Sequence, residues 1–201
     1  VEVVSEVELI DWDPEGERKM LAAMLYPYSR ASERQLVALV DQMSADEKLE
    51  VVKRYVGERG NRRHRPGRAL ERLGYRFDIL GDYGGFRDMQ RHRLLTIEWQ
   101  SLSPDHGYEV PEAIQAAGLT DRYVGVMERS KALYELLEPD YPEQAAYAVS
   151  MAFRVRYVMQ FNAREALHML ELRSQPQGHP NYADPIYCPV VGRIREARHL
   201  Q

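Results

Sequence analysis

Four segments of the chain have the side-chain pattern of β-strands. Apolar residues alternate with polar ones over residues 1–10, 75–80 and 153–158, as expected for strands with one buried face. Residues 94–102 are rich in β-branched and aromatic side chains, which favour strands. The pattern therefore predicts a small, mostly antiparallel sheet.

Helical patterns fill the stretches between these strands. Apolar residues recur at helical spacing over residues 15–28, and capping boxes at residues 32–35 (Ser-x-x-Gln) and 44–47 (Ser-x-x-Glu) predict two further helices. The other predicted helices cover residues 68–73, 86–90, 120–138 with Thr120 as the cap, 141–150, and 163–173 with Asn162 and Glu165 as a capping box. We therefore predict an α+β fold in which helices cover the sheet. It forms one domain over residues 1–201 and ends in an irregular tail, residues 181–201.

Composition excludes several classes of protein. The chain has 201 residues, 44% of them apolar and 29% charged, which is enough for one sizeable core. Its single cysteine, Cys188, excludes an internal disulfide framework and favours the cytoplasm. The apolar runs are too short for a membrane span, and a net charge of −4 disfavours nucleic acid as a partner. Because the chain begins with Val1, we expect a processed product or a piece of a longer protein.

Positive charge is concentrated in two places. Residues 59–68 hold five arginines and one histidine, and Arg91-His92-Arg93 follows one supersecondary unit later. Guanidinium groups in clusters can bind anions. Glycine and proline punctuate the first cluster and no aromatic residues interleave it, so a solvated loop is the alternative interpretation.

Several catalytic motifs are absent from the sequence. It contains no Gly-x-Gly-x-x-Gly, no phosphate-binding Gly-Lys-Ser/Thr, no Gly-x-Ser-x-Gly and no His-Glu-x-x-His. Its six histidines are scattered and show no paired ligand spacing. We therefore expect no catalytic metal.

Three segments occur in an order typical of one family. Arg91-His92-Arg93 directly precedes a predicted strand, Tyr75-Arg76-Phe77-Asp78-Ile79 lies upstream, and Asn162-Ala163-Arg164 opens a helix that ends in Leu172-Arg173. This set resembles the flavin-dependent thymidylate synthases, the ThyX family. Their signature Arg-His-Arg-x-x-Ser-x-Asn-Glu-x-Ser-x-Arg lies between a similar strand and an Asn-Ala-Arg helix. The resemblance is strongest over residues 45–180.

The resemblance implies a function and a set of site residues. Family members are homotetramers that bind FAD at subunit interfaces and methylate dUMP, with methylenetetrahydrofolate and NADPH as co-substrates. By the resemblance, the FAD site comprises Arg91, His92, Arg93, Asn162, Arg164 and His168. Ser101 and Arg173 would bind the uridine nucleotide, and Arg173 would also be catalytic by holding and activating the uracil.

Departures from the family signature affect mainly the nucleotide positions. Ser103 and Ala146 stand where the family has arginines that bind the nucleotide, and Trp99 replaces a Glu or Gln. A degenerate, non-catalytic domain that binds flavin or a sister ThyX domain is therefore the alternative function.

Each candidate side chain also has a purely structural interpretation. Arg91 and Arg93 could form ion pairs with Asp82, Asp88 or Glu98, which would leave His92 on the surface. Arg164, His168 and Glu171 could form a solvated stripe on one helix face. Arg173 could complement the helix macrodipole.

Overall fold

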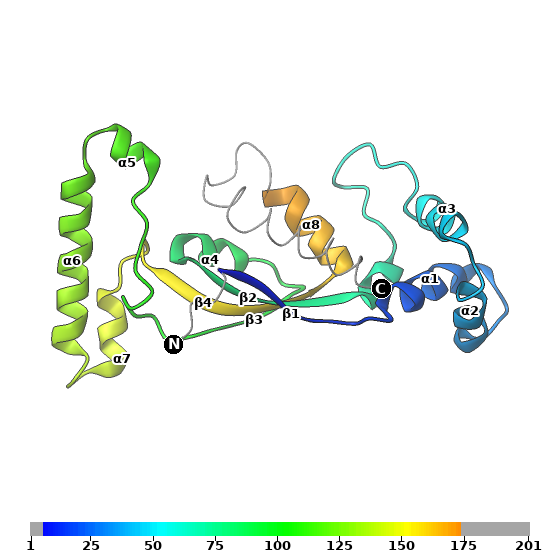
Figure 1. Ribbon diagram of the computed structural model, residues 1–201, viewed down its shortest axis with the longest axis horizontal. Coiled ribbons are helices and arrows are strands. Elements are labelled where there is room, and N and C mark those ends of the chain that lie inside the picture. Colours follow the sequence, from blue (N-terminus) through cyan, green and yellow to red (C-terminus); the bar gives the residue numbers. More distant parts are fainter. Residues whose placement is uncertain (1–5, 174–201) are drawn as a thin grey trace. The chain divides into compact units, whose positions relative to one another are not determined.

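The computed structural model describes residues 6–173 (Figure 1). The start of the strand predicted over residues 1–10 and the predicted tail, residues 181–201, lie outside the described residues, as does Cys188. Within the described range, the strands are separated by runs of one to several helices, as in an α+β protein. No helix in this range is both long enough and apolar enough to cross a lipid bilayer.

The chain divides into two compact units, which we name after one helix in each. The α8 unit comprises Val7–Phe77, Arg93–Thr96 and the described residues from Met159 onward. The α6 unit comprises Asp78–His92 and Ile97–Val158, together with Glu6.

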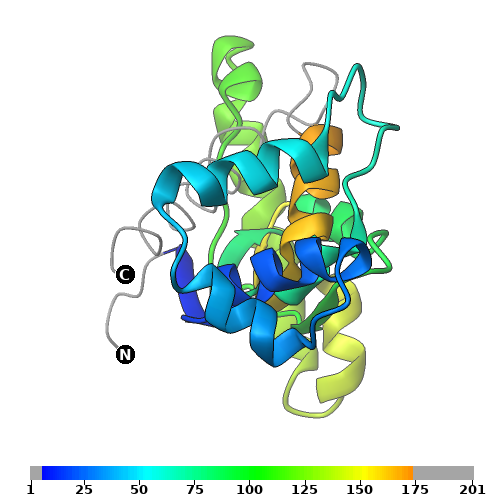
Figure 2. The ribbon, with the colours of Figure 1, turned by 90° about the vertical axis from the view of Figure 1, so that its right-hand side faces the viewer.

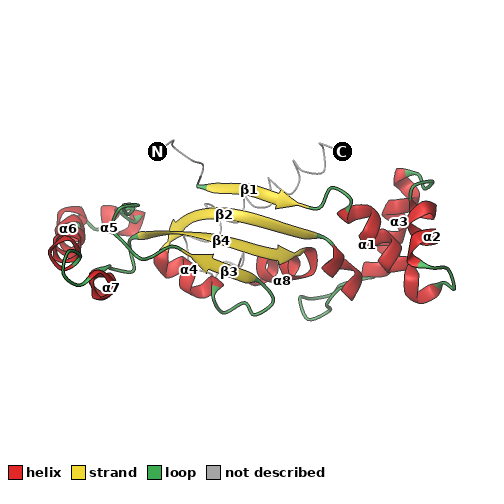
Figure 3. Ribbon diagram, turned by 90° about the horizontal axis from the view of Figure 1, so that it is seen from below, coloured by secondary structure: helices red, strands yellow, loops and turns green. Residues whose placement is uncertain are grey.

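Four strands form one antiparallel sheet in the order β1-β2-β4-β3 (Figure 3). They are β1 (Val7–Trp12), β2 (Gly74–Asp82), β4 (Arg154–Asn162) and β3 (Thr96–Trp99). Buried residues alternate with more exposed ones along β2 and β4, as the period of two in the sequence predicts. The predicted α+β class is therefore confirmed. The strand predicted over residues 94–102 is longer than the observed β3. The chain turns and bends over residues 93–95, and the strand ends at Trp99.

The α8 unit is built from short helices (Figure 2). Its core consists of aliphatic and aromatic side chains. Its helices are α1 (Gly16–Leu25), the 3-10 helix η1 (Tyr26–Tyr28), α2 (Glu33–Val40), α3 (Ala45–Val56), the 3-10 helix η2 (Arg68–Arg72) and α8 (Ala163–Arg173). α1 packs against α2, α3 and η2, and η2 packs against α8. The buried rings of Phe77 and Phe161 stack with their centroids 5.6 Å apart.

The α6 unit has a core centred on the aromatic ring of Phe86. Its helices are α4 (Tyr83–Met89), α5 (Glu112–Ala116), α6 (Thr120–Leu137), α7 (Pro142–Ala145) and the 3-10 helix η3 (Ala146–Ala148). The ring centroid of Phe86 lies 4.9 Å from that of Tyr157 and 5.4 Å from that of Trp99. α6 packs against α7 and η3. Figure 1 shows α6 and α7 side by side.

The two capping boxes predicted at residues 32–35 and 44–47 are present. The Ser32 hydroxyl accepts the Gln35 N–H at 3.4 Å, and the Gln35 side chain accepts the Ser32 N–H at 2.9 Å. The Ser44 hydroxyl accepts the Glu47 N–H at 3.3 Å, and the Glu47 carboxylate accepts the Ser44 N–H at 2.8 Å. α2 and α3 begin at the residues that follow these caps, as the sequence pattern predicts.

Other local predictions differ from the structure. Thr120 is the first residue of α6 and not its cap; Leu119 occupies the cap position, without a side-chain hydrogen bond. The helix predicted over residues 141–150 ends at Ala148, because Val149 has an extended backbone. It is α-helical in α7 and has 3-10 geometry in η3. The helix predicted over residues 68–73 is the 3-10 helix η2, and α5 was not predicted.

Candidate functional site

The end of β4 and the start of α8 are held together by a cap. Asn162 is the last residue of β4, and its side-chain oxygen accepts the Glu165 N–H at 2.9 Å. The Ala163 N–H donates to the Leu73 carbonyl at 2.7 Å, which joins the start of α8 to the residue before β2. Together these bonds fix the direction in which α8 leaves the sheet, and with it the positions of the side chains on α8.

Arg164, in the first turn of α8, is bound to partners from other segments of the chain. Its Nε donates to the Pro66 carbonyl at 3.0 Å, and its Nη1 donates to the Glu71 carboxylate at 3.1 Å. The Glu71 carboxylate also accepts from Arg68, and this hydrogen bond holds the pKa of Glu71 below its ordinary value, with the charge of Arg164 adding to the effect. Arg164 keeps a quarter of its side chain exposed.

His168 follows one turn later on α8 and is half-exposed. Its Nδ1 lies 3.3 Å from the carboxylate of Glu165, which is only 3% exposed. One turn further, Glu171 accepts two hydrogen bonds from the Arg59 guanidinium, at 2.6 and 2.8 Å. Arg164, His168 and Glu171 thus remain partly exposed, as the solvated stripe predicts, and each of them also contacts a specific partner.

The arginine cluster at residues 59–68 lies in the loop between α3 and η2, except for Arg68, which is the first residue of η2. Arg59 anchors this loop to α8 through Glu171, and its Nε also donates to the His64 carbonyl at 2.5 Å. The loop is largely exposed, as the interpretation of a solvated loop predicts.

Arg91, His92 and Arg93 follow the end of α4. The Arg91 guanidinium lies 3.3 Å from the Asp88 carboxylate, but the Arg91 side chain remains 76% exposed. His92 is only 7% exposed, so the alternative that placed it on the surface is wrong. Arg93 is exposed. The segment thus presents two accessible guanidinium groups on either side of a buried imidazole.

The positions compared with the family's nucleotide-binding residues lie at the end of β3, in the segment that follows it and at the start of η3. Ser101 is exposed, and the Ser103 hydroxyl donates to the Asp105 carboxylate at 2.8 Å. Trp99 is 51% exposed and packs against Phe86 in an edge-to-face arrangement. Ala146 is the first residue of η3. Ser103 and Ala146 therefore contribute no positive charge where the resemblance expects arginines.

Arg173 is the last residue of α8 and is partly exposed. In the division of the chain, Arg91, His92 and Ser101 belong to the α6 unit, and Arg93, Asn162, Arg164, His168 and Arg173 belong to the α8 unit. Within the α8 unit, α8 and its cap bring Asn162, Arg164 and His168 together on consecutive turns.

Glu71 was not predicted as a site residue, although it contacts Arg164. Its spacing of three residues from Arg68 on η2 was a signal for that ion pair. The contact with Arg164 joins residues 93 positions apart, and no local pattern in one sequence indicates such a pair.

Comparison with known proteins decides the family. A profile of the thymidylate synthase complementing proteins, called Thy1, matches residues 8–184. The chain belongs to this family. The resemblance to ThyX proteins, drawn from the Arg-His-Arg and Asn-Ala-Arg segments, is thereby confirmed.

Relatives of this family member are longer proteins. A UPF0159 protein of Chlamydia pneumoniae is 41% identical over 190 residues, which is 94% of this chain but 35% of the relative. A UPF0159 protein of Thermoplasma acidophilum is 33% identical over 183 residues, covering 89% of this chain and 36% of the relative. The chain thus spans about a third of the length of these curated relatives.

Solved structures show the same fold. ThyX of Helicobacter pylori, solved with FAD and dUMP, superposes with a TM-score of 0.63 at 18% identity, over 96% of this chain and 93% of that one. A second structure of the same protein, also with FAD and dUMP, gives a TM-score of 0.64 at 18% identity, with the same coverage. The chain is therefore a divergent family member with a ThyX-like fold.

Proposed function

We propose that this domain binds FAD and carries out the reductive methylation of a uridine nucleotide, of the kind that converts dUMP to dTMP. In this proposal methylenetetrahydrofolate supplies the one-carbon unit, NADPH is the reductant, and the protein works in the cytoplasm. The observation that carries the proposal is the family match over residues 8–184. The Helicobacter pylori protein of the same fold, solved with FAD and dUMP, supports it.

The chemistry of the predicted FAD residues fits the cofactor. Exposed guanidinium groups at Arg91 and Arg93 suit a pyrophosphate, because they donate paired hydrogen bonds to phosphate oxygens in a fixed geometry. Arg164 is oriented by Pro66 and Glu71 before any ligand binds, so less side-chain freedom is lost on binding. The half-exposed His168 adds a polar group one turn away. When bound and reduced by NADPH, the flavin would supply the hydride of the reaction.

We assign the uridine nucleotide to Ser101 and Arg173. A guanidinium at Arg173 would hold the edge of the uracil and stabilise negative charge on it, which is the role of a catalytic residue here. Ser101 is exposed and offers a hydroxyl. Because Ser103 and Ala146 provide no charge for a phosphate, we expect weak binding of dUMP.

We propose that the domain works in an assembly, either a homotetramer or a complex with a sister ThyX domain. The relatives' greater length supports the second form, because they have room for such a domain. Exposed apolar side chains on α6 support either form: Val126 is 51% exposed, Leu133 48% and Leu136 74%.

A degenerate, non-catalytic domain is the second candidate function. It is favoured by the surroundings of Ser103. This residue has no positive charge for a nucleotide phosphate, and its hydroxyl donates to the Asp105 carboxylate. Such a domain would bind flavin or a sister ThyX domain and stabilise the assembly.

A turnover assay separates the two candidates. The full-length protein is incubated with FAD, NADPH, methylenetetrahydrofolate and dUMP, and dTMP is measured by chromatography. The proposal predicts dTMP that depends on all four compounds and is lost in Arg173→Ala. Flavin binding without any dTMP, in a protein that also fails to bind dUMP, would contradict catalysis and establish the non-catalytic alternative.

A further inference from the structure

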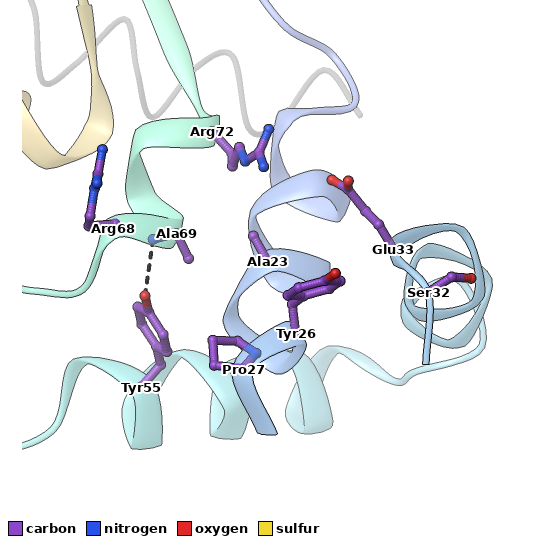
Figure 4. A pocket seen from close by; sticks show the side chains of 9 residues that line it. All are labelled: Ala23, Tyr26, Pro27, Ser32, Glu33, Tyr55, Arg68, Ala69 and Arg72. Atoms are coloured by element: carbon purple, nitrogen blue, oxygen red, sulfur yellow. Dashed lines mark hydrogen bonds between the residues drawn. The ribbon is translucent and has the colours of Figure 1, made fainter. Parts of the chain in front are cut away.

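A cavity of about 470 Å³ opens in the α8 unit among α1, η1, α2, α3 and η2 (Figure 4). Its volume lies within the range of about 300–1,000 Å³ that is typical of small-molecule sites. None of the residues that line it belongs to the proposed FAD or nucleotide sites. The cavity is therefore a separate candidate for a ligand.

Two opposite charges face this cavity. The guanidinium of Arg72 extends from η2, and the carboxylate of Glu33 extends from the first residue of α2 on the opposite wall (Figure 4). Both side chains are exposed, and neither has a hydrogen-bond or ion-pair partner within residues 6–173. Arg68, which also lines the cavity, is instead bound to Glu71. The cavity thus offers one free cation and one free anion.

The remaining wall is aromatic and apolar. The ring of Tyr26 is 55% exposed and lies beside Pro27, at the end of α1 (Figure 4). The Tyr55 ring is fixed, because its hydroxyl accepts the Ala69 N–H at 3.0 Å. A side chain at Gly67 would overlap Tyr55, so the glycine is needed for this close approach. On this wall the Tyr55 ring is thus held in a fixed orientation, and the Tyr26 ring offers exposed aromatic surface.

We propose that this cavity binds a zwitterionic α-amino acid with an aromatic or branched apolar side chain. Its carboxylate would pair with the Arg72 guanidinium, which matches a carboxylate in shape and charge. Its ammonium group would pair with Glu33, and its side chain would lie on Tyr26 and Pro27. One ligand thereby satisfies both unpaired charges and covers the exposed ring.

The charge balance of the cavity argues against a nucleotide here. A phosphate dianion would gain from Arg72 but would be repelled by Glu33 in the same space. A zwitterion has no net charge and meets an opposite charge at each end. The proposed amino-acid site is thus independent of the proposed uridine nucleotide site.

Calorimetry on the unmodified full-length protein tests the proposal with matched ligands. L-phenylalanine and L-leucine are titrated beside 3-phenylpropionate, which lacks the ammonium group, and 2-phenylethylamine, which lacks the carboxylate. We expect at least one amino acid to bind, and the two analogues to bind about tenfold to a hundredfold more weakly than L-phenylalanine or not at all, since each loses one charged contact. Equal binding of an analogue and L-phenylalanine would overturn the proposal. So would no binding of either amino acid at millimolar concentration.

Variants locate the binding in this cavity. Arg72→Gln and Glu33→Gln should each weaken binding of the amino acid about tenfold or more, whereas Arg54→Gln, on the exposed face of α3, should not change it. Unchanged affinity in both cavity variants would overturn the proposal. Their FAD content is measured as well and should equal that of the unmodified protein, so that failure here is distinguished from failure of the proposed flavin function.

Discussion

Glu71 joins two arginines that come from distant parts of the sequence. It accepts hydrogen bonds from Arg68 on the same 3-10 helix and from Arg164 on α8. The pKa of its carboxyl is lowered mainly by the bond from Arg68. A lowered pKa in the folded state means that ionised Glu71 stabilises the fold above the ordinary value of 4.5, and that this contribution is lost as the pH falls through the folded-state pKa.

Glu71→Gln should therefore reduce the free energy of unfolding near neutral pH, because the ionised carboxylate is lost. The loss should be only about 1 kcal/mol, since Arg68 is exposed and water screens its charge. The difference from the unmodified protein should shrink on acidification, where both proteins lack the charge. Urea denaturation at neutral and acidic pH measures this. Glu50→Gln, which removes an exposed pair on α3, is the control and should change the profile less. A constant difference at all pH values would contradict the assigned role.

Ser103 and Asp105 give a second prediction for a single position. Ser103→Arg should raise the affinity for dUMP about tenfold or more, because a guanidinium adds a charged contact to a phosphate. Ser103→Ala, which removes only the hydrogen bond to Asp105, is the matched control. Calorimetry measures both. Tight binding of dUMP to the unmodified protein, not improved by the added arginine, would show that another group holds the phosphate.

At the scale of elements, α3 depends strongly on its cap. None of its residues is fully buried, although α3 contacts α1 and its Tyr55 hydroxyl accepts the Ala69 N–H. Tertiary packing therefore holds α3 less firmly than a helix with a buried face. The hydrogen bonds between Ser44 and Glu47 satisfy backbone and side-chain groups at its first turn. α2, by contrast, buries Leu36 and Val40.

Ser44→Ala should destabilise α3 by about 1 kcal/mol and speed hydrogen exchange over residues 45–56. Ser32→Ala should have a smaller effect on exchange in α2, since packing holds that helix as well. Mass spectrometry of exchange after proteolysis resolves the two helices. Equal protection of α3 in Ser44→Ala and the unmodified protein would show that the cap is not what holds the helix.

Local signals explain which elements were predictable. Ser32, Ser44 and Asn162 cap helices within three residues of themselves, so one sequence contains the whole interaction. Thr120 was misleading because a cap residue is also tolerated inside the first turn. Within the candidate site, the cap at Asn162 was predictable. The contacts of Arg164 with Pro66 and Glu71 were not, because they depend on how distant segments pack.

At the scale of the whole molecule, the exposed apolar residues of α6 predict association. Light scattering should show a tetramer, or a dimer of fused pairs if the natural protein carries a sister domain. Leu136→Glu should lower the mass, because it places a charge on a 74% exposed leucine within the expected interface. A stable monomer with FAD bound at micromolar concentration would contradict assembly as a requirement.

The central claim, that this family member is a flavoprotein, is tested most directly by titrating the full-length protein with FAD and following the absorption spectrum. We predict a yellow protein that binds FAD. Replacing Arg91 and Arg93 with alanine should weaken binding at least about a hundredfold, since two charged contacts are lost. Arg87→Ala, which replaces an exposed arginine on α4, the helix that precedes Arg91, should leave FAD binding unchanged. A colourless protein that takes up no added FAD would contradict the claim.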